Sequence, residues 1–128
     1  MFHAYQWFGR AWALPEHVLA NTLRLQQPNG FWQNNYSFCP DIDGVWTAAH
    51  SASLGRVPLD AVRRACIRYL TAAEKTLNNA EFVFATYTNT HPLHGALLAI
   101  KECQTWFGQE LVVTASPWRS AIDDACFY

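Results

Sequence analysis

Two acidic side chains stand one residue apart in the segment Asp41-Ile42-Asp43-Gly44 and are the leading candidates for chemistry in this sequence. A carboxyl group can transfer a proton or hold a metal ion. Of the two candidate catalytic acids, Asp41 and Asp43, we favour Asp43. Because it precedes a helical pattern, Asp43 can also cap that helix by accepting a backbone N–H bond. Capping is the role that we predict, and the two roles can coexist.

Two histidines, His91 and His94, lie one helical turn apart and suggest a metal site. With Asp43 and either Cys103 or Cys126, they would complete a tetrahedral set of zinc ligands. A histidine at the start of a helix is also ordinary polar surface or a cap. We predict this simpler role, with no metal and no cofactor.

The sequence offers no clear nucleophile–base pair. His50 and Ser51 are adjacent, so on a helix their side chains would point about 100° apart. No glycine-rich phosphate loop is present.

Aromatic side chains make up 15% of the sequence and offer a second kind of site. They can line an apolar ligand pocket or pack helices together, and we predict packing for most of them. The candidates for ligand contact are Phe31, Trp32, Tyr36, Phe38, Trp46 and Tyr87, together with His91 and His94.

Prolines and amphipathic periodicity predict the helices that would position these residues. The main helices are expected at residues 15–27, 43–54, 58–77 and 92–107. Three of them begin at a proline, which suits a first helical turn because its missing N–H would have no partner there. The pattern over 58–77, with apolar residues at three- and four-residue steps, is the clearest. The helix over 43–54 is rich in small residues, so we expect another helix to pack closely against it.

The remaining segments carry weaker signals. Residues 80–89 have a strand-like composition, but an isolated strand has nothing to pair with, so a loop or short extended piece is expected. Residues 2–12 and 118–127 are predicted to be helical.

Composition limits the class of protein. Apolar types reach 51% and charged types only 15%, whereas ordinary soluble domains carry about a quarter charged residues. The net charge of −1, without a basic stripe, argues against nucleic acid as a partner. No apolar run is long enough to cross a bilayer, and the N-terminus lacks the pattern of a signal peptide. We therefore expect one cytoplasmic domain whose four cysteines are mostly buried free thiols.

The spacing Gln26-x-x-x-Gly30-x-Trp32 resembles the Q-x-x-x-G-x-W motif of terpenoid cyclases and their relatives, which have α/α toroid folds. In such a segment the glutamine bonds backbone groups at a helix end. The glycine permits a sharp chain reversal, and the tryptophan packs across the next hairpin.

The segment Asp41–Ala48 stands where such folds begin an inner helix. It resembles the D-x-D-D segment of class II terpene cyclases, in which the middle acid, here Asp43, protonates the substrate. It is also similar to the D-G-C segment at the zinc site of protein prenyltransferase β subunits, where Asp43 would be a ligand. Gly44 replaces the last acid of the first segment, and Val45 replaces the cysteine of the second. The cyclase segment and the prenyltransferase segment therefore each lack one of their functional residues in this chain.

We expect an all-α fold of antiparallel helical hairpins that resembles a fragment of an α/α toroid. The expected function is a non-catalytic interaction or scaffold module that forms a homo-oligomer, with a dimer favoured, and that binds neither nucleic acid nor membrane. The alternative is an isoprenoid- or lipid-binding domain, or a degenerate enzyme of the cyclase or prenyltransferase kind, with its site near Asp43. A third reading makes the chain a portion of a longer enzyme.

Overall fold

The computed structural model describes residues 10–34, 39–87, 90–108 and 111, and this part of the chain contains five helices and no strand. The helices are α2 (Pro15–Leu25), α3 (Cys39–Leu54), α4 (Asp60–Leu77), α5 (Ala80–Tyr87) and α6 (Thr90–Phe107). The predicted all-α class is therefore confirmed for the described residues. Of the predicted flanking helices, residues 2–9 and 118–127 lie outside the described part, and residues 10–12 are not helical.

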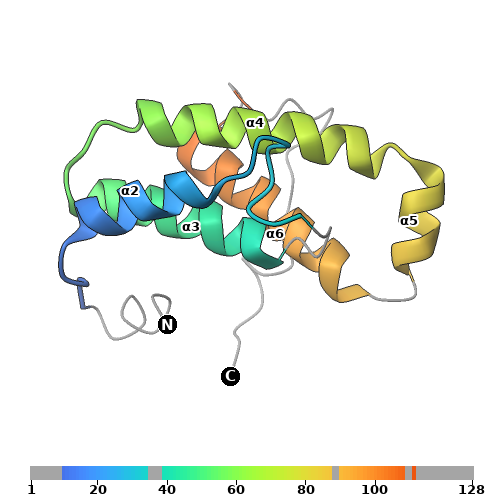
Figure 1. Cartoon of the computed structure of the whole chain (residues 1–128), viewed down its shortest axis with the longest axis horizontal. Coiled ribbons are helices and arrows are strands. Elements are labelled where there is room, and N and C mark those ends of the chain that lie inside the picture. Colours follow the sequence, from blue (N-terminus) through green and yellow to red (C-terminus); the bar gives the residue numbers. More distant parts are fainter. Residues whose placement is uncertain (1–9, 35–38, 88–89, 109–110, 112–128) are drawn as a thin grey trace.

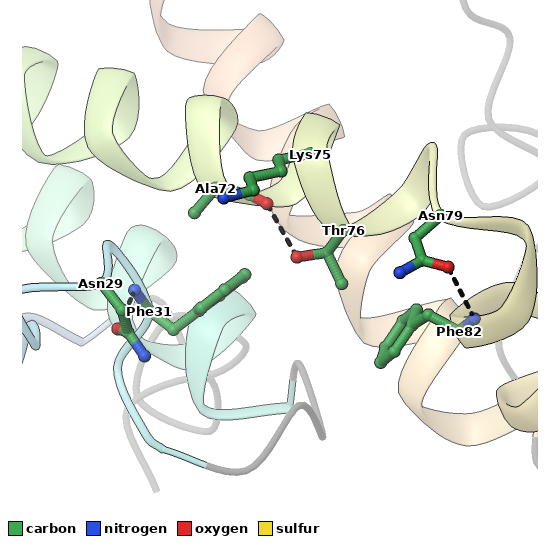
Figure 2. A pocket seen from close by; sticks show the side chains of 7 residues that line it. All are labelled: Asn29, Phe31, Ala72, Lys75, Thr76, Asn79 and Phe82. Carbon is green, nitrogen blue, oxygen red and sulfur yellow. Dashed lines mark hydrogen bonds between the residues drawn. The ribbon is translucent and has the colours of Figure 1, made fainter.

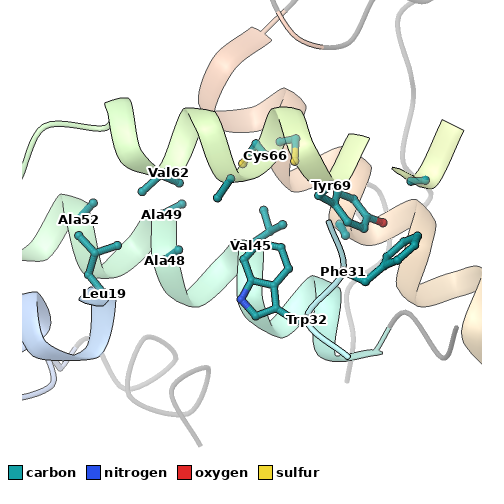
Figure 3. Packing of buried hydrophobic residues seen from close by; sticks show 14 of the residues in the cluster. Leu19, Phe31, Trp32, Val45, Ala48, Ala49, Ala52, Val62, Cys66 and Tyr69 are labelled. Carbon is teal, nitrogen blue, oxygen red and sulfur yellow. The ribbon is translucent and has the colours of Figure 1, made fainter. Parts of the chain in front are cut away.

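Helix α3 lies at the centre, packed against α2, α4 and α6 (Figure 1). Its small residues Ala48, Ala49 and Ala52 are each at most 1% exposed, because neighbouring helices cover them on more than one side. The expectation of close packing against this helix is confirmed. Figure 3 shows the resulting core, in which Leu19 of α2 and Val62 of α4 lie beside α3.

Helix α4 turns the predicted apolar stripe inward. Val62, Cys66, Tyr69 and Ala73 are all buried, at three- and four-residue steps. The Tyr69 hydroxyl donates a hydrogen bond to the Ala96 carbonyl oxygen at 3.2 Å, which joins α4 to α6 and satisfies the buried phenol.

Helix α3 begins four residues before the predicted start, so the prediction that Asp43 caps it was wrong. The first turn contains Cys39 and Pro40, and proline is well tolerated there. Asp43 is the fifth residue of the helix, and its side chain is exposed.

The prediction of a loop or extended piece over residues 80–89 was also wrong, because residues 80–87 form α5. Asn79 explains the difference. Its side-chain Oδ1 accepts a hydrogen bond from the Phe82 N–H at 3.2 Å, and its carbonyl oxygen accepts one from the Val83 N–H at 3.0 Å. Asn79, which directly follows the C-cap residue Asn78 of α4, thus caps α5. The other boundaries shift by about one turn or less, with α2 ending at Leu25 and α6 beginning at Thr90.

The contact between Gly44 and the Trp32 indole predicts that a methyl group added at position 44 lowers the stability of the fold. A Cβ at Gly44 would overlap the indole ring, so Gly44→Ala should lower the free energy of unfolding by about 1–3 kcal/mol, despite the higher helix propensity of alanine. Urea unfolding followed by circular dichroism measures this change.

Gly55→Ala is the matched control. The nearest atoms to its new Cβ would belong to the flexible side chain of Glu16, which can move aside, so the change should stay within about 0.5 kcal/mol. Equal effects of the two substitutions would contradict the packing described for Trp32.

Candidate functional site

Gln26 lies directly after α2 and connects that helix to α4. Its Nε2 donates hydrogen bonds to the carbonyl oxygens of Gly30 and Ala65, both at 2.9 Å. Its Oε1 accepts a hydrogen bond from Nη2 of Arg68. The amide thus holds the loop that follows α2 and fixes this loop against α4.

Gly30 occupies a position that only glycine fits. Its φ is +94°, a conformation that costs other residues strain. A Cβ there would lie 2.6 Å from the Arg68 carbonyl oxygen, so the backbone could not approach α4 as it does. The predicted chain reversal at this residue is therefore present.

The Trp32 side chain attaches the loop to α2 and α3. The ring is 8% exposed and lies against Gly44, and its Nε1 donates a hydrogen bond to the Thr22 carbonyl oxygen at 2.8 Å. Figure 3 shows the indole beside Val45 of α3. Gly44 therefore provides space for this ring.

Asp41 is the buried acid of the candidate segment, with only 1% of its surface exposed. Its Oδ1 accepts a hydrogen bond from the Trp32 backbone N–H at 2.7 Å. Burial raises the pKa of Asp41 to about 6, and the bond from Trp32 opposes that rise. The carboxyl group can therefore change its charge near neutral pH, but its geometry serves to attach the loop to α3.

Asp43, two residues later, faces the exposed side of α3. Side chains two residues apart on a helix point about 200° apart, which separates the two acids. Both still act on the thiol of Cys39, whose pKa is raised by burial first and then by the charges of Asp43 and Asp41. The arrangement keeps this thiol protonated rather than activating it as a nucleophile.

Trp46, proposed as a ligand contact, belongs to an aromatic cluster between α3 and α6. It is 6% exposed and stacks on His50, with ring centroids 4.2 Å apart. Trp106 contacts the His50 ring edge-on, with ring centroids 5.2 Å apart. The His50 Nε2 lies 3.3 Å from Oε1 of Glu102, and that same oxygen accepts a hydrogen bond from the Trp106 Nε1 at 2.7 Å.

Sequence reasoning missed this His50–Glu102 pair. Trp46 and His50 are four residues apart, as are Glu102 and Trp106, so each pair was visible as helix neighbours. Nothing in the sequence indicated that the two pairs face one another. A carboxylate that orients an imidazole is half of a proton-transfer pair, but among the described residues no hydrogen bond joins His50 to a serine or cysteine.

The structure describes only some of the remaining candidates. Tyr36, Phe38 and Cys126 lie outside the described residues. Tyr87 ends α5 and His91 lies in the first turn of α6, while the side chain of His94 is exposed.

The described residues contain no group of three or more histidines, cysteines and acids that could hold a metal ion. Cys103 is fully buried and shares a hydrogen bond with Cys66 of α4, and together with burial this contact raises the pKa of its thiol. Both cysteines are free thiols, as the sequence predicted.

No family model, curated protein or solved structure matched this chain. Within the part of the chain that the structure describes, the helices are too short or too polar to cross a membrane.

The raised pKa of Asp41 predicts a dependence of stability on pH. An ordinary aspartate has a pKa of 3.8, so between about pH 4 and pH 6 the folded chain binds more protons at this site than the unfolded chain. The free energy of unfolding must then fall as pH rises, by about 3 kcal/mol for this shift.

Asp41→Asn keeps an oxygen for the Trp32 N–H and removes the titration. As the pH rises from about 4 to about 7, the difference in unfolding free energy between the variant and the parent chain should therefore grow by about 3 kcal/mol in favour of the variant. Urea titrations across this range test the effect, with Asp43→Asn as an exposed control that should show no such gain. Parallel pH curves for Asp41→Asn and the parent would refute it.

Proposed function

We propose that this chain is a non-catalytic helical interaction module that associates with a second copy of itself. The observation that carries the proposal is the apolar surface of α5, at one end of the described structure (Figure 1). This helix of eight residues carries a single charged side chain, Glu81.

Phe84 is the main feature of that surface. It is 78% exposed, more than any other large apolar side chain among the described residues. Ala85 beside it is also exposed, whereas Phe82 and Val83 are half-buried. Exposed aromatic residues are enriched in protein interfaces, where they add a large contact area at a small cost in side-chain entropy.

A second copy is a suitable partner for this surface. The chain has a net charge of only −1, so two copies can approach without strong repulsion. Most soluble oligomers pair identical surfaces about a twofold axis, which would bring the two α5 helices together. The high apolar content of the sequence supports the same conclusion.

The contacts of Gln26, Gly30 and Trp32 also support the proposal that α2 and α3 form a hairpin related in architecture to the repeats of α/α toroids. The segment joins two antiparallel helices and docks them on a third. In this proposal the motif organises packing and takes no part in a reaction.

The alternative function, an isoprenoid or lipid site near Asp43, has weaker support. The rings of Trp32 and Trp46 are buried against Gly44 and His50, so neither offers an open face to a ligand. Asp43 itself is exposed rather than directed into a cavity. This function stays a prediction that a thermal-shift screen with prenyl diphosphates can test.

Substitution of Phe84 tests self-association. We expect the parent chain to be a dimer by light scattering coupled to size-exclusion chromatography, and Phe84→Lys to be a monomer. The lysine would place two charges in the α5 interface. Because Phe84 is exposed and near the C-terminus of its helix, lysine should leave the stability of the monomer within about 0.5 kcal/mol.

Leu54→Lys is the matched control, because Leu54 is also exposed and ends α3 at the opposite end of the structure (Figure 1). It should remain a dimer. A monomeric parent chain, or a dimer that withstands Phe84→Lys, would overturn the proposal.

A further inference from the structure

A cavity of about 360 Å³ lies between the loop after α2, the last turns of α4 and the start of α5 (Figure 2). Its apolar lining comes from Phe31, Ala72 and Phe82. Figure 2 shows the two phenyl rings projecting toward this space from opposite sides. A cavity of about 150 Å³ can hold a benzene molecule, so this one is large enough for a ligand of more than one ring.

Two asparagines at the edge of the cavity have their oxygen atoms already in use. Oδ1 of Asn29 accepts the Phe31 N–H at 3.0 Å, and Oδ1 of Asn79 accepts the Phe82 N–H at 3.2 Å. A backbone N–H can only donate, so these bonds fix which side-chain atom is the oxygen. Asn79 is left with its NH₂ group, a donor, on the side of the cavity, whereas Asn29 lies beside Phe31 on the opposite side (Figure 2).

Lys75 adds a positive charge to the same edge. It stands four residues before Asn79, and both residues line the cavity where α4 ends. Its side chain is exposed, and it forms no ion pair with another described residue. Thr76 uses its hydroxyl proton toward the Ala72 carbonyl oxygen at 2.9 Å, which leaves its methyl group toward the cavity (Figure 2).

We propose that this cavity binds a small amphiphilic carboxylate, with its apolar body between Phe31 and Phe82 and its carboxylate on Lys75 and the Asn79 amide. Where α4 ends, the cavity offers one neutral donor and one cation, which match a group with a single negative charge. A diphosphate carries more charge than one lysine can balance. Neither Asp43 nor Phe84 lines this cavity.

Calorimetric titration of the full chain with 1-naphthylacetate and with octanoate tests this site. Both should bind, and the neutral 1-naphthylacetamide should bind about tenfold more weakly, because it lacks the charge that Lys75 recognises. Geranyl diphosphate should bind no more tightly than the two carboxylates. Lys75→Met, which removes the charge but keeps an unbranched side chain only one atom shorter, should weaken naphthylacetate binding by about tenfold, and Lys75→Arg should restore most of it.

Arg64→Met is the control, since it removes one positive charge from an exposed position on the same helix but outside the cavity. It should change the affinity by less than about twofold, the small effect expected of a distant screened charge. Circular dichroism checks that each variant is folded. The proposal fails if the parent chain binds neither carboxylate, if Lys75→Met binds as the parent does, if the amide binds equally well, or if geranyl diphosphate binds more tightly.

Discussion

The hydrogen bond from the Trp32 backbone N–H to the Asp41 carboxylate is the contact on which the described structure depends most. It joins the loop after α2 to the first turn of α3, in a place from which water is almost wholly excluded. A buried carboxyl group is costly unless its oxygens have partners. The loop must therefore bring a donor to Asp41, and the other features of the segment hold that donor in position.

Those features act in sequence along the loop. Gln26 fixes the start of the loop to Ala65 of α4, and Gly30 lets the backbone turn at close distance to the same helix. Trp32 then reaches the space that Gly44 leaves on α3. The same path places Phe31 beside α4, where it contacts Tyr69 edge-on and lines the cavity next to α5. One short loop thus determines the contacts of three helices and one wall of the candidate ligand site.

The sequence predicted much of this fold because the signals were local. The periodicity of α4, the prolines near the helix starts and the loop at Gly30 each depend on residues close together in the chain. The predictions failed where more than one residue could begin a helix. Asp43 is a good capping residue, but proline also suits a first turn, and the helix begins at Cys39 with Pro40 in that turn. The helix α5 was missed because residues 80–89 have a strand-like composition, whereas Asn79 caps a helix there. Contacts between distant segments, such as that of His50 with Glu102, could not be predicted. A single sequence does not indicate which face of one helix packs against which face of another.

Hydrogen exchange of the Trp32 backbone amide, measured by NMR under native conditions, tests the central role of the Asp41 contact most directly. Trp32 lies in a loop, where amides usually exchange through small local openings. If its bond to Asp41 holds α2, α3 and α4 together, this amide should exchange only through global unfolding, with a free energy equal to that from urea denaturation. Exchange at the rate of an exposed loop amide would contradict the account.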